Sequence, residues 1–261
     1  TSDLVELLAL EKTMDERKAV NPSCRPQTPS LETHYRYSPR GEGPSHGPSI
    51  SIQGEGLSFA YSLGVLQYIY ETFELDKARF CVTSGGTFPV MALLNGWAPV
   101  EWMEHCWPRC YAHWREPRSL LFDGMDFLRA LWDGFLAVDI HEKCRGRLFI
   151  NLTSLDTEMH TAGTRIAQKF ESRAHLIELL LGAKGIPGFT LVSELYHLVH
   201  SEKTVDGAFT NKAPRLDRHT VLVSSVAPSL QPTGFHYTIS PSHHQAHPPP
   251  PPPQQHQTPP T

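Results

Sequence analysis

Several features that would place the chain in a familiar class are scarce or missing from its 261 residues. Cysteine is scarce, and its odd count and scattered positions argue against a disulfide framework and favour reduced thiols. No uninterrupted apolar run approaches the roughly 18 residues expected of a membrane-spanning helix. The opening stretch from Leu4 to Leu10 is broken by a charge and lacks a basic flank, which is atypical of a signal peptide. We therefore expect a cytoplasmic protein.

An excess of positive charge is also missing. The chain has 23 lysines and arginines against 27 aspartates and glutamates, a net charge of −4 with a pI near 6.4. This balance gives no electrostatic case for nucleic-acid binding. A hydrophobic content of 39% is enough to build a core. The composition is that of an ordinary soluble globular protein.

Proline, serine and glycine mark the boundaries of the expected domain. Residues 1–47 predict a short helix, from Asp3 to about Lys18, followed by a flexible linker. Residues 241–261 form a tail rich in proline, histidine and glutamine, which should be disordered. Its six consecutive prolines could dock an SH3 or WW domain, although a solvated tail is the simpler interpretation. Residues 48–240 remain as the folded domain.

Within 48–240, β-like runs alternate with helical periodicity. The expected strands cover 49–52, 79–82, 147–152, 204–205 and 220–223. The expected helices cover 59–73, with one apolar face, and 175–181, which should stop at Gly182 or shortly after it. The face of the first helix should contain Phe59, Leu63, Leu66, Tyr70 and Phe73. Such alternation predicts an α/β fold with a mostly parallel central sheet and helices on both faces.

Ser84 stands where an expected strand turns into a helix, in the run Cys81-Val82-Thr83-Ser84-Gly85-Gly86-Thr87. A sharp turn of this kind lifts a hydroxyl out of the sheet and directs the next helix N-terminus at a developing oxyanion. A glycine-rich turn without a catalytic role is an equally good interpretation of this run alone. A literal G-x-S-x-G around Ser45 lies in the linker with no strand before it, so we interpret it as chance.

Two other junctions carry polar or glycine-rich turns. Gly54-Glu55-Gly56 lies between a strand and an amphipathic helix, and its backbone N–H groups could face an anion. Asp206-Gly207-Ala208 follows the strand at 204–205. Each turn alone is common, and only their order along the chain gives them weight.

Taken in order, the three junctions resemble the patatin-like phospholipase family. That family has a G-G-G-x-R-G loop, a G-x-S-x-G elbow and a D-G-G or D-G-A turn. Residues 54–59, 82–86 and 206–208 stand at the corresponding places, with Asn211 and Pro214 following the last of them. The strand at 146–153 and the segment 176–189, with its Ile186-Pro187-Gly188, are also similar to the family pattern. The resemblance covers roughly 48–225.

The resemblance implies a lipid acyl hydrolase of the phospholipase or triacylglycerol lipase type, with a Ser–Asp dyad and an acyl-enzyme intermediate. Ser84 would be the nucleophile and Asp206 its base, with no metal or organic cofactor. The oxyanion hole would come from Gly54, Glu55, Gly56, Leu57 and Gly85, and the motif also includes Gly86, Gly207 and Ala208. The implied partners are an acyl-lipid substrate and a membrane or lipid-droplet surface, which the protein would contact peripherally.

Some residues depart from the family pattern. Glu55 replaces a glycine of the loop and would oppose an oxyanion unless its carboxylate points away. Ser58 stands in place of the family arginine, and Phe59 in place of a glycine. Val82 replaces a glycine of the elbow, which could displace that turn. A catalytically impaired relative that binds lipid or acts as a scaffold is therefore a second hypothesis.

A third hypothesis is a Ser–His–Asp hydrolase of the general α/β type, since His219 and His236 both follow Asp206. The two cysteines and two histidines within 105–113 could hold zinc, but without a second ligand pair we favour packing by Trp102, Trp107 and Trp114. We interpret the tail histidines, His243, His244 and His247, as low-complexity sequence rather than metal ligands.

Overall fold

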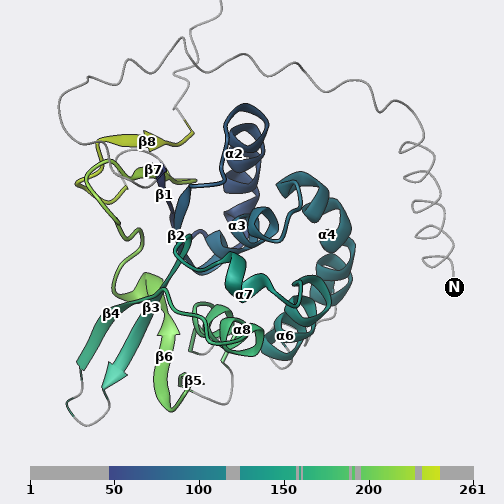
Figure 1. The fold of residues 1–261 in the computed structure, drawn as a ribbon. Coiled ribbons are helices and arrows are strands. Elements are labelled where there is room, and N and C mark those ends of the chain that lie inside the picture. Colours follow the sequence, from purple (N-terminus) through teal and green to yellow (C-terminus); the bar gives the residue numbers. More distant parts are fainter. Residues whose placement is uncertain are drawn as a thin grey trace, which may run out of the picture. The chain divides into compact units, whose positions relative to one another are not determined.

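A computed structural model describes residues 47–115, 124–156, 159, 161–187, 190–191, 195–226 and 231–241 (Figure 1). The predictions for the N-terminal helix, the linker with Ser45 and the tail after residue 241 lie outside these residues. None of the described helices is long and apolar enough to cross a membrane.

The described residues build an α/β fold on one mixed sheet of eight strands. The strands are β1 (Ser49–Ile52), β2 (Arg79–Thr83), β3 (Leu148–Asp156), β4 (Thr161–Ala167), β5 (His197–Val199), β6 (Glu202–Asp206), β7 (Val221–Val223) and β8 (Tyr237–Ile239). Their order is β5-β6-β3-β2-β1-β7-β8, and β4 also pairs with β3. All five strands expected from the sequence are present, whereas β4, β5 and β8 were not foreseen.

The expectation of a mostly parallel sheet is not confirmed. β3, β2, β1, β7 and β8 pair in parallel. The pairs β3–β4, β3–β6 and β5–β6 are antiparallel. The antiparallel half arises because β3–β4 and β5–β6 are hairpins, joined by the short connections 157–160 and His200–Ser201. Such connections are too short for the crossover that parallel strands need.

The helices are α2 (Phe59–Thr72), α3 (Thr87–Leu94), α4 (Pro99–Arg115), α6 (Gly124–Phe135), α7 (Ile140–Lys143) and α8 (Arg173–Gly182). Three short 3-10 turns, η2 (Gly56–Ser58), η3 (Ser84–Gly86) and η4 (Gly207–Phe209), follow β1, β2 and β6. Figure 1 shows α2, α3, α6 and α8 on the same side of the sheet. The sequence predicted helices on both faces of the sheet. Among the described residues, no helix layer covers the second face.

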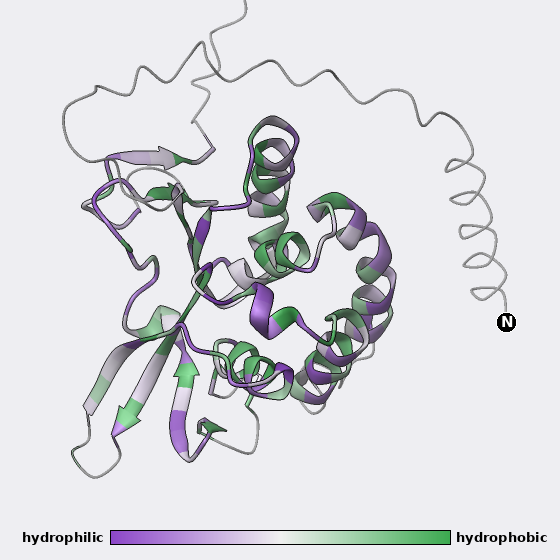
Figure 2. Cartoon of the chain, viewed as in Figure 1, coloured by the Kyte–Doolittle hydropathy of each residue, from purple (hydrophilic) through white to green (hydrophobic). Residues whose placement is uncertain are grey.

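Apolar periodicity explains how this helix layer packs. α2 buries Phe59, Leu63, Leu66 and Ile69, so its last buried turn uses Ile69 rather than the expected Tyr70, which is exposed. Phe88 on α3 lies at the centre, with its ring 4.9 to 5.6 Å from those of Phe59, Trp102 and Trp132. Aromatic groups at such distances join several helices into one core. Figure 2 shows the outer side of α4 as largely hydrophilic.

The second face of the sheet is built from small and polar residues. Ser51 pairs with Cys81 there, Asn151 pairs with Thr83, and all four residues are fully buried. The irregular segment 211–220, which links η4 to β7, packs on this face. Its Asn211 carbonyl accepts a hydrogen bond from Asn151 (2.6 Å), and its Asp217 pairs with Arg79 (2.5 Å). The irregular segment 211–220, and not a helix, therefore packs against this face.

The cysteines behave as reduced core residues. Cys81, Cys106, Cys110 and Cys144 are free and buried, and burial raises their thiol pKa values to between about 11 and about 12. Such thiols are poor nucleophiles at neutral pH. Trp102 is buried as expected, while Trp107 is exposed.

Candidate active site

The register of the sheet brings Ser84 and Asp206 together. Residues 150–151 of β3 pair with β2 and β4 at once, and residues 152–153 pair with β4 and β6 at once. A strand has only two edges, so β2 and β6 share the edge opposite β4 and run toward each other along it. β2 ends at Thr83, opposite Asn151, and β6 ends at Asp206, opposite the next residue, Leu152. The carboxyl ends of β2 and β6 therefore meet head to head.

Ser84 lies at a sharp strand-to-helix turn. It has a φ of +50°, which is uncommon for a residue with a side chain, and only 7% of its surface is exposed. Small residues allow this turn. A Cβ added to Gly86 would lie 2.6 Å from a methyl group of Ile52, and one added to Gly85 would clash with the carbonyl of Gly56. Strain of this kind is typical of functional sites.

Asp206 is 2% exposed, and its carboxylate accepts a hydrogen bond from the N–H of Ala208 (2.8 Å) and interacts with the Ser84 side chain. Its own N–H donates to the Gly185 carbonyl (2.9 Å). Burial raises the pKa of Asp206, while the hydrogen bonds from Ser84 and Ala208 and the charge of Lys184 lower it. A carboxylate with a raised pKa that contacts a hydroxyl is suited to accept its proton.

The turn after Asp206 needs a glycine. A Cβ on Gly207 would collide with the backbone and amide of Asn151. The Asn151 side chain is also a positioning group that the sequence did not reveal as one. It donates to the Thr83 hydroxyl (3.1 Å) and to the Asn211 carbonyl (2.6 Å). It thereby ties the strand before Ser84 to the segment after Asp206.

The loop Gly54–Leu57 lies against the elbow. A Cβ built on Gly54 would lie 3.4 Å from the Cβ atoms of Ser84 and Ala208, and Gly56 packs on Gly85. Gly56 has a φ of +54°, which favours glycine. The Gly54 N–H donates to the Lys212 carbonyl (3.0 Å), and the Ser58 N–H donates to the Glu55 carbonyl (2.9 Å). Donors to an oxyanion would then have to come from Glu55, Gly56, Leu57 and Gly85.

The Glu55 carboxylate is held by residues outside the elbow. Its two oxygens accept hydrogen bonds from the Ser62 hydroxyl of α2 (2.5 Å) and from the Ser225 N–H beyond β7 (2.6 Å). Burial raises the pKa of Glu55. Its φ of −124° needs no glycine. Glu55 therefore anchors the loop to α2 and to the segment after β7.

Val82 does not crowd the elbow either. It is fully buried in the core layer, paired with Ile52 and Ile150 on the neighbouring strands. The close approach of strand, loop and helix falls a few residues later, at Gly85 and Gly86. The expected displacement of the elbow by Val82 is not seen.

Lys184 is the charged group that the sequence did not single out. It follows α8, and its ammonium group donates to the Ser84 carbonyl (3.0 Å) and to the Thr87 hydroxyl. The same Nζ lies 4.2 Å from the ring centroid of Phe88. Complete burial lowers the pKa of Lys184 to about 7. A lysine at a helix end is usually expected to be solvated. The small residues on either side of Lys184 were the only feature of the sequence that could have indicated its burial.

Comparison with known proteins adds no assignment, because no family model and no curated protein matches the chain. The site must therefore be judged from its geometry.

The histidines of the triad hypothesis lie elsewhere. His219 and His236 are both exposed, and the ring of His219 accepts a hydrogen bond from Arg218 (2.9 Å). Among the described residues, neither histidine has a hydrogen bond to Asp206 or Ser84. The Cys/His segment 105–113 lies on α4 and does not form a metal-like cluster within the described part of the chain. The tail histidines lie outside the described residues.

Proposed function

We propose that the chain is a patatin-like lipid acyl hydrolase that uses Ser84 and Asp206 as a catalytic dyad. The observation that carries the proposal is the interaction of the Ser84 side chain with the buried Asp206 carboxylate, at a serine with positive φ between a strand and a helix. The order of the loop, the elbow and the aspartate turn along the chain adds support. The three lie close together, since a Cβ built on Gly54 would be 3.4 Å from the Cβ atoms of Ser84 and Ala208.

In this mechanism Asp206 accepts the proton of Ser84 as Oγ attacks the ester carbonyl carbon. The tetrahedral intermediate collapses to an acyl-serine, and the proton passes from Asp206 to the departing alcohol. Asp206 then takes a proton from water, whose oxygen attacks the acyl-serine. When the second tetrahedral intermediate collapses, the fatty acid leaves and the proton passes from Asp206 back to Ser84 Oγ. In this proposal the N–H groups of Gly56 and Gly85 would stabilise the oxyanion in both steps. The protein residues supply all the proton transfers.

An acyl-lipid substrate and peripheral contact with a membrane or lipid droplet remain part of the proposal. One local feature favours an apolar substrate: Phe209 lies three residues after Asp206, and 61% of its surface is exposed. A large exposed aromatic side chain beside a catalytic group is suited to contact an acyl chain. The proposed location is cytoplasmic, with peripheral attachment to such surfaces.

A second candidate function is lipid binding or scaffolding without turnover. The observation that favours it is the Gly54 N–H, which is already used by the Lys212 carbonyl and is lost as an oxyanion donor. Loss of one such donor elsewhere costs about two to three orders of magnitude in rate. The remaining donors make hydrolysis the better-supported function.

The dyad is tested by replacing its base. Asp206→Asn should abolish hydrolysis of a short-chain ester, because an amide cannot accept the Ser84 proton. Single His219→Gln and His236→Gln variants should retain most of the turnover, since both histidines are exposed and remote from the dyad contacts. Loss of several orders of magnitude in either folded histidine variant would instead support a Ser–His–Asp triad.

A further inference from the structure

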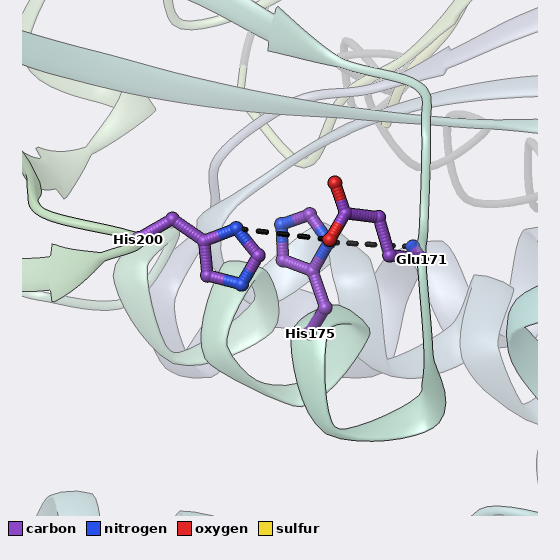
Figure 3. Close-up of side chains that lie close together, drawn as sticks. All are labelled: Glu171, His175 and His200. Atoms are coloured by element: carbon purple, nitrogen blue, oxygen red, sulfur yellow. Dashed lines mark hydrogen bonds and ion pairs between the residues drawn. The ribbon is translucent and has the colours of Figure 1, made fainter.

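Two histidines and a glutamate converge at the opposite end of β6 from Asp206. Glu171 precedes α8, His175 lies in the first turn of that helix, and His200 lies in the turn between β5 and β6 (Figure 3). Each residue offers one ligand atom, and all three atoms lie within 4.8 Å of one another. His200 follows His175 by 25 residues, so the fold, not local sequence, brings it to this place.

The backbone holds His200 in an unusual conformation. His200 and Ser201 have φ values of +47° and +71°, so two residues with side chains occupy the left-handed region in succession. This turn places the His200 ring over that of His175, with centroids 4.1 Å apart. The Glu171 carboxylate lies 4.0 Å from Nδ1 of His200, and the Glu171 N–H donates to Nδ1 of His175 (3.3 Å).

The other charged groups near the cluster are paired with one another, so the Glu171 carboxylate remains available to bind a cation. Glu178 is occupied by Arg129 and His197, and Arg165 pairs with Glu202. Among the ion pairs of the described residues, Glu171 contacts only the His200 ring. His175 is 9% exposed, whereas the side chains of Glu171 and His200 are largely exposed.

We propose that Glu171, His175 and His200 form a site for a divalent transition metal ion, best matched by Zn²⁺. Two imidazoles and one carboxylate are a common zinc ligand set, and imidazole disfavours Ca²⁺ and Mg²⁺. Tetrahedral zinc places its ligand atoms about 3.3 to 3.5 Å apart, so the cluster must contract. The Glu171 and His200 side chains are 73% and 56% exposed, which leaves them free to reorient and leaves room for a water ligand.

Such an ion would be structural. It would clamp the β5–β6 turn to the start of α8, the helix that precedes Lys184 and Gly185. β6 leads from the same turn to Asp206. The ion lies outside the Ser–Asp site and takes no part in the proposed acyl transfer.

The site is tested by titrating the full chain with Co²⁺ and following the intense visible absorption of tetrahedral cobalt, with Zn²⁺ as the competitor. The unmodified protein should bind one ion in this form. His200→Gln and, separately, Glu171→Gln should weaken binding at least about tenfold, because each removes a ligand. His219→Gln, which alters an exposed histidine outside the cluster, should titrate like the unmodified protein.

A variant with His243, His244 and His247 all changed to Gln controls for the tail and should keep the same absorption. Two results would overturn the proposal: no tetrahedral absorption in the unmodified protein, or a His200→Gln variant that titrates as the unmodified protein does. If His200→Gln does not fold, the exposed Glu171→Gln decides the question in the same way.

Discussion

At the scale of single residues, buried charge is the feature that distinguishes this site. Asp206 and Lys184 are both buried within one small region, and each modifies the other's protonation. Lys184 contacts the Ser84 carbonyl and not the reacting hydroxyl, so we regard it as a positioning residue. Its charge favours the ionised form of Asp206, which the proposed proton transfer requires.

Removing this charge should shift the pH dependence of catalysis. Lys184 has a pKa of about 7, and its positive charge lowers the pKa of Asp206. Lys184→Met should therefore raise the pKa of Asp206 and move the acid limb of kcat/KM to higher pH. A pH profile with a short-chain ester measures the shift. An acid limb that stays in place would show that Lys184 only fills space.

Glu55 shows why a substitution cannot be judged from its residue type alone. On the sequence, a carboxylate in an oxyanion loop looks harmful. In the fold the same group bridges Ser62 and Ser225 and holds the loop in place. The outcome depends on a serine 7 positions away and another 170 positions away, and the latter contact is invisible to any local pattern.

At the scale of elements, the loop after β1 and the elbow after β2 act as one unit. Gly85 is where they touch, because an added Cβ there would clash with the Gly56 backbone. Gly85→Ala should push the loop off the elbow and lower kcat/KM by about two orders of magnitude or more, the usual cost of one oxyanion donor. Steady-state ester hydrolysis measures the loss.

Gly64→Ala is the matched control for this change. Gly64 is an exposed glycine of α2, and nothing lies within 4 Å of a Cβ built there. The substitution should leave turnover unchanged and stabilise the helix by up to about 1 kcal/mol. A Gly85→Ala variant as active as Gly64→Ala would show that the loop and the elbow are not coupled.

At the scale of the whole molecule, the sequence predicted the five strands that carry or flank the site, because each is a short apolar run between turn signals. It did not predict β4, β5 or β8. β4 is largely exposed and polar, as in Thr161 and Thr164, so it lacks the apolar run of a buried strand. Because β4 and β5 were not predicted, the two antiparallel hairpins that they form with β3 and β6 were not predicted either.

The approach of Ser84 and Asp206 could be proposed from the resemblance, but local sequence patterns do not contain it. It depends on which residue of β3 each strand end faces, and that register is set by long-range pairing with Asn151 and Leu152. Lys184 was missed because its burial arises only when the end of α8 packs behind the elbow. Local propensity carries no trace of such tertiary contacts.

The central claim is that Ser84 is an activated nucleophile, and labelling with a fluorophosphonate probe tests it most directly. The unmodified protein should be labelled, and Ser84→Ala should not. Ser45→Ala, which alters the literal G-x-S-x-G of the linker, should be labelled like the unmodified protein. Labelling that survives in folded Ser84→Ala, or that disappears in Ser45→Ala, would contradict the account.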